Sequence, residues 1–411
     1  MINVKSLLAV VLLVLGLLPA QRLYAAKPDR IPGQILVKFI EGTSEDEINR
    51  QVRGVGGNRI GNLEALDVEV ISVPEQAADR ILTALSHNPK VEFAEPDFIA
   101  EASDPDPYYA SFQWGFNNTG QTVNGVTGII DADIDAPEAW SAVSGGVRVA
   151  VLDTGVAQSH ADLSSKLAAN RDFTGSSTGF NDIYGHGTHV AGIISAVSGN
   201  GQGVAGGCPN CTIMNGKVLN DSGSGAYSWI ANGINWATDN GAKVINLSLG
   251  GSSRSFTLES AVNRAWNNGV IVAAAAGNSA NQSKTYPAAY ANAIAVAATD
   301  NRDAKAYFSS YGAKWVDVAA PGAYIFSTWN DSDSSSNPQP VCDVSGCYKF
   351  ASGTSMATPV VSAVAGLVWA SPYGSSTNSV RNRIESRSDP VTGTGSYWKW
   401  GRVNAFRSVS P

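Results

Sequence analysis

Val147-Arg-Val-Ala-Val-Leu-Asp-Thr-Gly155 is the stretch that decides the fold class of this 411-residue chain. Its first six residues form an almost unbroken apolar run, and the run ends at the carboxylate of Asp153. Such runs are typical of strands in a parallel sheet, because these strands are buried on both faces. We therefore predict a buried parallel strand that delivers Asp153 to one edge of a sheet.

The chain beyond residue 140 repeats this strand pattern, with helical patterns between the repeats. Similar apolar runs cover Val244–Leu247, Val270–Ala274 and Ile294–Ala298. Helical patterns cover residues 187–197, 225–240, 256–268 and 355–370. Alternation of strands and helices predicts an α/β fold in which a parallel sheet has helices on both faces.

Residues 31–99 show a different pattern, typical of a small α+β unit. The expected elements are a strand at Ile35–Phe39, a helix from the capping box Ser44-Glu-Asp-Glu47 to Val55, a strand at Asp67–Val73, a helix from Pro74 to Leu85, and a short strand at Val91–Phe93 that Pro96 ends. These elements precede an Asp- and Pro-rich segment, Ala102–Tyr109, which we interpret as an exposed linker that is easily cut.

Charge density supports a module boundary at residue 102. Residues 27–102 contain 22 charged side chains in 76 positions, whereas residues 103–411 contain 39 in 309. The alternative interpretation is one domain with a polar edge. The whole chain has a net charge of −7, which argues against non-specific binding to nucleic acid.

The N-terminus has the pattern of a secretion signal over residues 1–26. Lys5 precedes an apolar run from Leu7 to Leu18, and the small residues Ala25 and Ala26 follow. The run is too short to span a bilayer, which needs about 20 apolar residues. We expect a secreted, extracellular protein without stable membrane association. A membrane anchor made from the same stretch is the alternative.

The four cysteines are Cys208, Cys211, Cys342 and Cys347. An even number of cysteines in an exported protein indicates disulfide bonds. Three pairings are possible, and the local pairing of neighbours along the chain is the simplest. A zinc site is the alternative, since Cys208-x2-Cys211 has metal-like spacing, but Cys342-x4-Cys347 fits zinc less well.

Three motifs contain residue types that suit nucleophilic catalysis. Asp153 ends the buried strand, Gly185-His-Gly-Thr-His189 opens a helix, and Gly353-Thr-Ser-Met-Ala357 delivers Ser355 to a helix start. A serine hydroxyl needs a base such as histidine, and a buried carboxylate orients that histidine and stabilises its charged form. Strand ends and helix starts at one edge of a parallel sheet are where such groups can converge.

The small number of histidines narrows the choice of base. Of the four, His87 lies in the N-terminal module and His160 lies in a loop soon after the first motif. His186 begins its helix and can point into a cleft, whereas His189 lies inside the helix and is expected to be structural. A zinc role for this pair is less favoured, because the usual zinc-protease helix reads His-Glu-x-x-His.

These motifs together identify a resemblance: the chain is similar to subtilisin-family serine proteases (subtilases), nearest to the thermitase type. The resemblance covers about residues 106–411 apart from an insertion at 331–347. The matching stretches are VAVLDTGV at 149–156, GHGTHVAG at 185–192, SLGG at 248–251, AAAGN at 274–278, GTSMATP at 353–359 and GTGSYWKWGRVNA at 393–405. The resemblance implies a serine endopeptidase domain over 103–411.

The resemblance also implies the roles of individual residues. Asp153 orients His186, which takes the proton from Ser355, and Ser355 forms an acyl-enzyme with the substrate. The side chain of Asn278 and the backbone N–H of Ser355 stabilise the oxyanion. The residues implied to bind substrate are Ser248, Leu249 and Gly250 as an edge strand, and Ala275, Ala276, Gly277 and Thr285 around a side-chain pocket, which the β-branched Thr285 is expected to shorten.

A structural Ca²⁺ site is implied in the same way. Its expected side-chain ligands are Asp106, Asp162 and Asn200, and its expected carbonyl ligands come from Val197, Gln202 and Val204. The alternative is that these are ordinary polar loop residues. A second calcium site of the family is not supported, because Ser176 and Ser177 stand after Asp172 where acidic residues would be expected.

Residues 31–99 resemble the inhibitor-like, ferredoxin-like propeptide of these enzymes. This resemblance implies that residues 27–102 are a folding module and temporary inhibitor, removed by self-cleavage near Ala102. The expected partners are peptide and protein substrates and the chain's own propeptide, and the enzyme is expected to be a monomer. Two other functions are weighed against it: an inactive binding protein of the same fold and a metal-dependent hydrolase.

Overall fold

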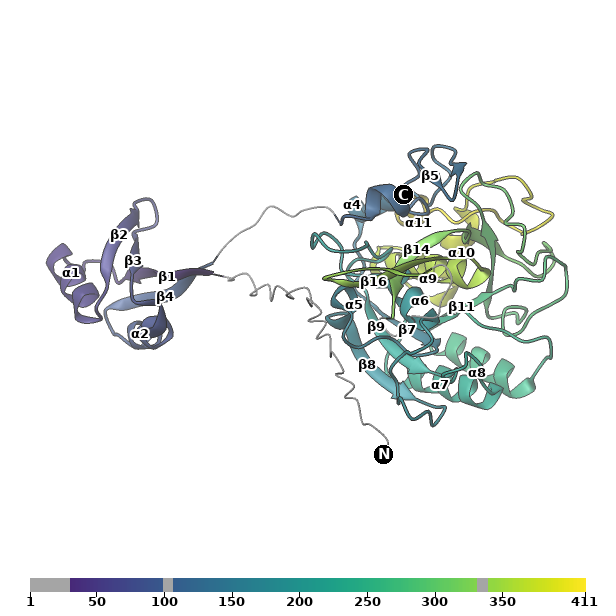
Figure 1. Ribbon diagram of the computed structural model, residues 1–411, viewed down its shortest axis with the longest axis horizontal. Helices are drawn as coiled ribbons and strands as arrows, with labels where there is room; N and C mark the ends of the chain where they lie inside the picture. The colour runs from purple at the N-terminus through teal and green to yellow at the C-terminus, as the bar shows by residue number, and fades with distance from the viewer. Residues whose placement is uncertain (1–29, 99–105, 331–338) are drawn as a thin grey trace, which may run out of the picture. The chain divides into compact units, whose positions relative to one another are not determined.

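The computed structural model describes residues 30–98, 106–330 and 339–411. The predicted secretion signal, the first half of the predicted linker and most of the polar part of the insertion lie outside the described residues. The chain forms two compact units, Met1–Ala102 and Ser103–Pro411, and each has its own hydrophobic core (Figure 1).

The first unit is a four-stranded antiparallel sheet with two helices. The strand order is β2-β3-β1-β4. Its elements are β1 (Arg30–Phe39), α1 (Glu45–Gly54), β2 (Asn58–Leu63), β3 (Val68–Ser72), α2 (Ala78–Ser86) and β4 (Val91–Phe98). This order of elements and strands confirms the predicted ferredoxin-like unit. Alternate residues of β1, Ile35 and Val37, are buried against the helices, as a one-sided sheet requires.

Two local predictions for this unit are wrong. Pro96 does not end the last strand, because β4 continues to Phe98 and Pro96 lies opposite Ile35. A proline is tolerated there because β4 is an edge strand, whose outward N–H groups have no strand to bond. The capping box is also absent: Ser44 makes no side-chain cap bond, and the Glu47 carboxylate accepts from Arg50 and a neighbouring glutamine instead.

The second unit contains the predicted parallel sheet, with seven strands in the order β13-β12-β11-β10-β7-β9-β8. Every neighbouring pair of strands is parallel. The strands are β7 (Arg148–Asp153), β8 (Leu167–Asp172), β9 (Thr212–Lys217), β10 (Val244–Leu247), β11 (Ile271–Ala275), β12 (Ile294–Thr299) and β13 (Val318–Pro321). Three of them, β8, β9 and β13, were not predicted from the sequence.

Helices cover both faces of this sheet, as predicted. Val149 and Val151 of β7 pack in one core with α6 (His186–Ser195) and α9 (Thr354–Ala370). Ala150 and Leu152, which point the other way, pack in a second core with α7 (Tyr227–Asp239) and α8 (Phe256–Asn267). The two-residue alternation of an extended strand therefore supplies side chains to both cores.

The strand order places a topological switch point at β7. From β7 the sheet extends through β9 and β8 on one side and through β10 to β13 on the other. Ligands of open parallel sheets bind beyond the carboxyl ends of the strands at such a point. Asp153 is the last residue of β7, so it lies at the favoured place for a site.

Smaller elements complete the second unit. A three-stranded antiparallel sheet, in the order β14-β16-β15, packs beside α6. The smaller elements are α3 (Tyr109–Phe112), β5 (Thr122–Val123), β6 (Val126–Thr127), α4 (Ala136–Ala142), α5 (Ala161–Ser164), β14 (Ile325–Trp329), β15 (Val341–Asp343), β16 (Gly346–Ala351), α10 (Thr377–Ser386) and α11 (Ala405–Val409). Within the described ranges, no helix has the length and apolarity needed to cross a membrane.

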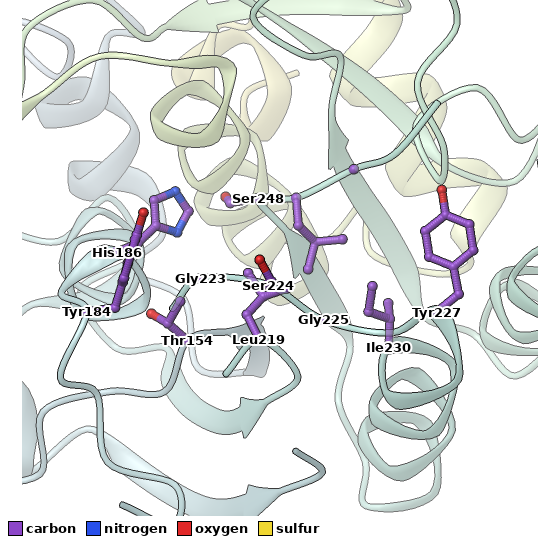
Figure 2. Close-up of a pocket in the computed structure, with 12 residues that line it drawn as sticks. Thr154, Tyr184, His186, Leu219, Gly223, Ser224, Gly225, Tyr227, Ile230 and Ser248 are labelled. Atoms are coloured by element: carbon purple, nitrogen blue, oxygen red, sulfur yellow. The ribbon is translucent and has the colours of Figure 1, made fainter. Parts of the chain in front are cut away.

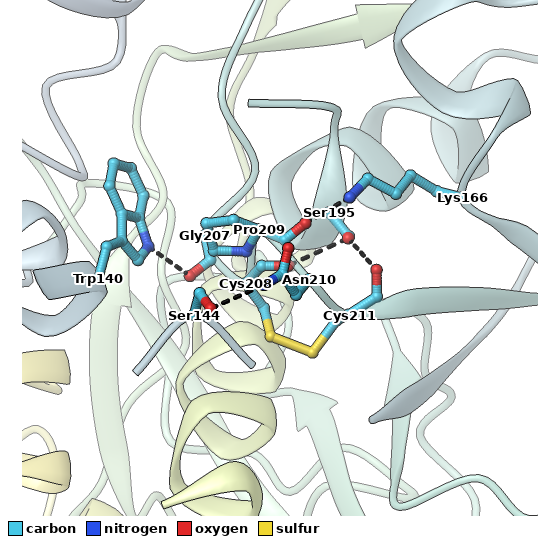
Figure 3. Close-up of a disulfide and its surroundings, with 9 residues drawn as sticks. All are labelled: Trp140, Ser144, Lys166, Ser195, Gly207, Cys208, Pro209, Asn210 and Cys211. Atoms are coloured by element: carbon cyan, nitrogen blue, oxygen red, sulfur yellow. Dashed lines mark hydrogen bonds between the residues drawn. A yellow bond between two sulfur atoms is a disulfide. The ribbon is translucent and has the colours of Figure 1, made fainter. Parts of the chain in front are cut away.

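Two disulfides join cysteines that are close in the sequence. The Cys208–Cys211 bond is fully buried, and Figure 3 shows it below the carboxyl end of α6. There the hydroxyl of Ser195 donates to the carbonyls of Cys208 and Cys211 at 3.1 and 2.5 Å. The second bond, Cys342–Cys347, joins β15 to β16 in the insertion.

Candidate active site

Asp153 is positioned by the end of β7 and by its neighbour. The side chain is completely buried, and its Oδ1 atom accepts a hydrogen bond from the backbone N–H of Thr154 at 2.8 Å. The same oxygen lies 2.7 Å from Nδ1 of His186. A carboxylate in this place fixes the ring orientation of the histidine and the tautomer that has its proton on Nδ1.

His186 is the first residue of α6, and 22% of its side chain is exposed. In Figure 2 its ring lies on one side of a pocket, near Tyr184 and Thr154, while Ile230 and Tyr227 lie on the other side. Burial lowers the pKa of His186, but the charge and hydrogen bond of Asp153 and the charge of Asp182 outweigh burial, so the net pKa is raised. Below this raised pKa the ring is cationic, and above it Nε2 can accept a proton.

Asp182 is a buried carboxylate that the sequence reasoning missed. It accepts hydrogen bonds from Thr154 Oγ1, from the backbone N–H groups of Tyr184, Gly185 and Thr188, and from Thr188 Oγ1, at 2.7–3.0 Å. It thus joins the residue after Asp153 to the first turn of α6. Its position four residues before His186 was the available signal, because acidic residues are favoured at helix N-termini.

Ser355 lies in the first turn of α9 and is held against the end of β10. Its hydroxyl donates to the carbonyl of Ser248 at 3.1 Å, and the hydroxyl of Ser248 donates to the carbonyl of Ser355 at 2.7 Å. The Ser355 hydroxyl therefore points to Ser248 in this structure. Catalytic hydrogen bonds are often formed only when substrate is bound, so this geometry is compatible with proton transfer to His186.

Asn278 is held with its amide group towards the start of α9. Its Oδ1 atom accepts from the N–H and the hydroxyl of Thr354 at 2.9 and 3.0 Å. A Cβ atom at position 353 would lie 3.3 Å from Nδ2 of Asn278 and 3.6 Å from the backbone nitrogen of Ser355. The two nitrogens therefore flank one small space, which the absence of a side chain at Gly353 keeps open.

Two pockets adjoin these residues and share Leu249 and Gly250. The first has a volume of about 430 Å³ and is bordered by His186 and Ser248 (Figure 2). Its other walls were not predicted from the sequence: Thr154, Tyr184, Leu219, Gly223, Ser224, Gly225, Tyr227 and Ile230. The second, of about 350 Å³, is bordered by Ser355 and Asn278.

The residues expected around a side-chain pocket are brought together with one difference. Ala275, Gly277 and Thr285 line the second pocket. A Cβ atom on Gly250 would lie 2.4 Å from the Thr285 methyl group, so this methyl faces the shared edge of the pocket. Ala276 does not line it, since its side chain is buried in a separate core with Trp398.

His189 has no place in either pocket. It is completely buried, and its Nε2 lies 2.9 Å from the carbonyl oxygen of Lys349 and 3.1 Å from that of Ile325. Burial lowers the pKa of His189 to about 3, so the ring is neutral and donates to these carbonyls. In the described parts of the chain, no group of three or more His, Cys, Asp or Glu residues is arranged to hold a metal.

The side chains expected to bind Ca²⁺ converge on the loop 199–204. Asp106 accepts hydrogen bonds from the backbone of Gly199 and Asn200, and the Asn200 side chain donates to Asp162 at 3.0 Å. Asp162 also accepts from the N–H of Val204 at 2.9 Å. The remaining expected ligands lie in the same region: Val197 bonds the backbone of Asp162, and Gln202 bonds Asn200.

The two carboxylates of this cluster are buried without a basic partner. Asp106 is 6% exposed and Asp162 is fully buried, and the ion pairs among the described residues include neither. Burial raises the pKa of Asp162 to about 6, the nearby Asp106 adds to the rise, and hydrogen bonds offset it only in part. A bound cation would relieve this cost of burial.

Comparison with known proteins agrees with this geometry. Residues 144–397 match the model of the subtilase family, and residues 24–97 match that of the fervidolysin N-terminal prodomain. Thermitase of Thermoactinomyces vulgaris is 45% identical over 74% of this chain and 98% of its own length. A thermophilic serine proteinase of Bacillus sp. strain AK1 is 37% identical over 92% of this chain and 88% of its own.

A solved structure gives the same result. A protease from Pseudoalteromonas arctica PAMC 21717 superposes with a TM-score of 0.64 at 30% identity, over 75% of this chain and 98% of its own. The family match covers more than half of the chain, and the parallel sheet is flanked by helices as that fold requires. The chain is therefore a subtilisin-like serine protease of the subtilase family, with an N-terminal prodomain.

Proposed function

We propose that Ser355 is the nucleophile of this protease, His186 its general base, and Asp153 the carboxylate that orients the base. The observation that supports this assignment most directly is the 2.7 Å contact between His186 Nδ1 and Asp153. Two hydrogen bonds between Ser355 and Ser248 support it further, because Ser248 borders the same pocket as His186. The enzyme is accordingly an endopeptidase that forms an acyl-enzyme.

Each residue has a defined step in this mechanism. His186 Nε2 takes the proton of the Ser355 hydroxyl as its oxygen attacks the peptide carbonyl carbon. The negative oxygen of the tetrahedral intermediate is stabilised by the Asn278 amide and the Ser355 backbone N–H. His186 then gives its proton to the leaving amine, and the C–N bond breaks. Water, activated by the same histidine, hydrolyses the acyl-enzyme and restores Ser355.

Substrate binds in this proposal as an extended strand along Ser248–Gly250. An added strand gains affinity from backbone hydrogen bonds, and the pockets beside it read alternate side chains. The second pocket, which Ser355 borders, suits the side chain before the cut bond. The first pocket, which His186 borders, shares Leu249 and Gly250 with the second pocket. It suits the side chain of another residue of the same bound peptide.

A structural Ca²⁺ held by Asp106, Asp162 and Asn200 also belongs to the proposal, with carbonyls of Val197, Gln202 and Val204. Calcium prefers six to eight oxygen ligands, and this loop cluster offers carboxylate, amide and backbone oxygens. Two buried carboxylates that form no ion pair with any described residue support the assignment. Bound calcium would supply the missing positive charge, and the chain's residues would fix the loops around it.

The precursor assignment completes the proposal. Residues 1–26 are a secretion signal, 27–102 a folding module and temporary inhibitor, and 103–411 the secreted enzyme. Release requires a cut near Ala102, which the enzyme makes itself. The division of the chain into units at residues 102 and 103 and the match to a prodomain over 24–97 support this arrangement.

Expression of the full chain and its Ser355→Ala variant tests the proposal. We expect the parent to shorten by roughly the first hundred residues, while the variant stays full length, because removal of the nucleophile stops self-cleavage. N-terminal sequencing of the secreted parent locates the cut. A Ser371→Ala variant, which removes a hydroxyl from the far end of the same helix, should be processed like the parent. Processing of Ser355→Ala in a host without other proteases would refute self-cleavage.

A further inference from the structure

The insertion forms a hairpin that contacts the proposed calcium cluster. In this hairpin, β15 and β16 pair antiparallel, and the Cys342–Cys347 disulfide closes it. The side chain of Tyr348 is completely buried, and its hydroxyl lies 3.2 Å from Oδ2 of Asp162 and 2.9 Å from Oγ of Ser345. A hydroxyl from β16 of the hairpin, one residue after the insertion, thus donates to a carboxylate that is a proposed ligand.

His160 links the same hairpin to Asp162 by a second route. Its Nδ1 accepts the backbone N–H of Asp162 at 3.2 Å, and its Nε2 donates to the carbonyl of Cys347 at 3.0 Å. The backbone N–H of Ala161 donates to the carbonyl of Ser345 at 3.2 Å. The segment that contains Asp162 is therefore bonded to the turn of the hairpin, at Ser345, and to β16, at Cys347.

The other two segments of the cluster also meet the hairpin. The hydroxyl of Tyr108, two residues after Asp106, donates to the Asp343 carboxylate at 2.8 Å. In the loop 199–204, a Cβ atom on Gly203 would lie 2.0 Å from the Tyr348 hydroxyl oxygen and 2.3 Å from Oδ2 of Asp162. The segments that contain Asp106, Asp162 and Asn200 thus all contact the hairpin.

The two disulfides differ in what they can affect. Cys208 and Cys211 are fully buried, and their carbonyls accept from the hydroxyl of Ser195 at the end of α6 (Figure 3). Cys342 is exposed and Cys347 is buried, and the carbonyl of Cys347 is the one that His160 contacts. Closing the turn covalently holds Ser345, Cys347 and Tyr348 in the positions from which they contact the cluster.

We propose that the disulfide-closed hairpin Val341–Ala351 is a wall of the cation site, and that Tyr348 holds Asp162 in the orientation that binds Ca²⁺. This inference rests on the proposed calcium site. Hydrogen-bond partners of metal ligands fix the ligand's orientation, and their loss typically weakens metal binding about 10–100-fold. The hairpin therefore sets the affinity of the site, although it supplies none of the proposed ligands.

Calcium titration of the full chain in a Ser355→Ala background tests the inference without self-digestion. The variants are Tyr348→Phe, which removes only the hydroxyl, and Cys342→Ser with Cys347→Ser, which opens the hairpin. Tyr290→Phe is the matched control, because its buried hydroxyl bonds Ser255 and not the cluster. After treatment with a chelator, calorimetry gives the dissociation constant for Ca²⁺, and thermal unfolding gives the shift of Tm on addition of Ca²⁺.

We expect Tyr348→Phe to weaken calcium binding about ten-fold or more, the opened hairpin to weaken it at least as much, and Tyr290→Phe to bind like the parent. If Tyr348→Phe is folded and binds calcium as tightly as the parent, the hairpin is not a wall of the site, and the calcium proposal still stands. If the parent binds no calcium, the calcium proposal itself fails and this inference with it.

Discussion

Asp153 and Asp162 are both completely buried carboxylates, but their surroundings differ in one respect. Asp153 faces His186, a side chain that can become positively charged, at 2.7 Å. The hydrogen bonds that Asp162 receives from the described residues come from the uncharged donors Asn200, Val204 and Tyr348, and a second carboxylate, Asp106, lies near enough to raise its pKa. The chain therefore supplies a counter-charge at the proposed catalytic carboxylate, whereas the proposed Ca²⁺ would supply it at the other.

Neutralising each carboxylate in turn is the strongest way to break this comparison. Asp153→Asn should lower kcat about 10⁴-fold, because the amide no longer holds the productive tautomer of His186; this magnitude is that of serine proteases with the same triad. Asp162→Asn, assayed well below its Tm, should leave kcat within a few-fold of the parent. Initial rates on a chromogenic peptide measure both, after maturation in trans by an active enzyme that is then removed.

Unfolding temperatures complete that test. Asp162→Asn should lose the calcium-dependent part of the Tm, and Asp153→Asn should keep it, because only the first variant changes the proposed cation cluster. Similar losses of kcat in both variants would contradict the division of roles.

The oxyanion side of the site gives the next largest expected effect. Asn278→Ala should lower kcat about 10²–10³-fold with little change in KM, because the amide is needed when negative charge develops; the range is carried over from subtilisin itself. Steady-state kinetics with one peptide give both constants. Asn292→Ala, which removes an amide that donates to Asn263 and lies outside both pockets, should behave as the parent. An unchanged kcat for Asn278→Ala would exclude it as a donor.

The smallest expected effect concerns pH and sharpens the comparison. His186 must be neutral to take the Ser355 proton, and the charges of Asp153 and Asp182 raise its pKa. The kcat/KM of the parent should therefore fall as pH drops through a value above about 6.5, the usual histidine pKa. Asp182→Asn removes one of these charges, so the acidic limb should move to lower pH.

A matched variant separates charge from structure in this experiment. Asp133 is also a buried carboxylate that accepts backbone N–H groups, from Asn118 and Asp135, but it has no part in the pKa of His186. Asp133→Asn should leave the midpoint of the acidic limb where it is in the parent. An unshifted midpoint in Asp182→Asn would show that Asp182 acts on His186 through packing alone.

The sheet was predictable wherever burial on both faces left an unbroken apolar run, as in β7, β10, β11 and β12. The prediction missed β9 because its sequence, Thr-Ile-Met-Asn-Gly-Lys, contains polar residues that are nevertheless buried. Lys217, the last of these, is fully buried because it pairs with Asp221 and donates to the carbonyl of Thr154. Asp221 is only four residues away, but Thr154 is 63 residues away along the chain, so local sequence cannot show that second partner.

The candidate site divides in the same way. Asp153, His186 and Ser355 stand in short motifs with strong local constraints, so the sequence alone was enough to propose them as catalytic residues. Tyr348 contacts Asp162 across 186 residues of chain, and no local pattern relates the two positions. The burial of Ala276 away from the pocket likewise depends on the partner Trp398, far along the chain.

Helix α6 has a consequence for how damage would spread through the enzyme. Its first residue, His186, presents the imidazole, and its last residue, Ser195, is tied to the Cys208–Cys211 turn about 15 Å away. Because a helix of this length is stiff, a change in the hydrogen bonds at Ser195 would tilt the whole of α6, including His186. Loss of the contact between Ser195 and the Cys208–Cys211 turn would therefore move the His186 imidazole without changing any substrate-binding residue. The expected result is an enzyme that is folded but inactive.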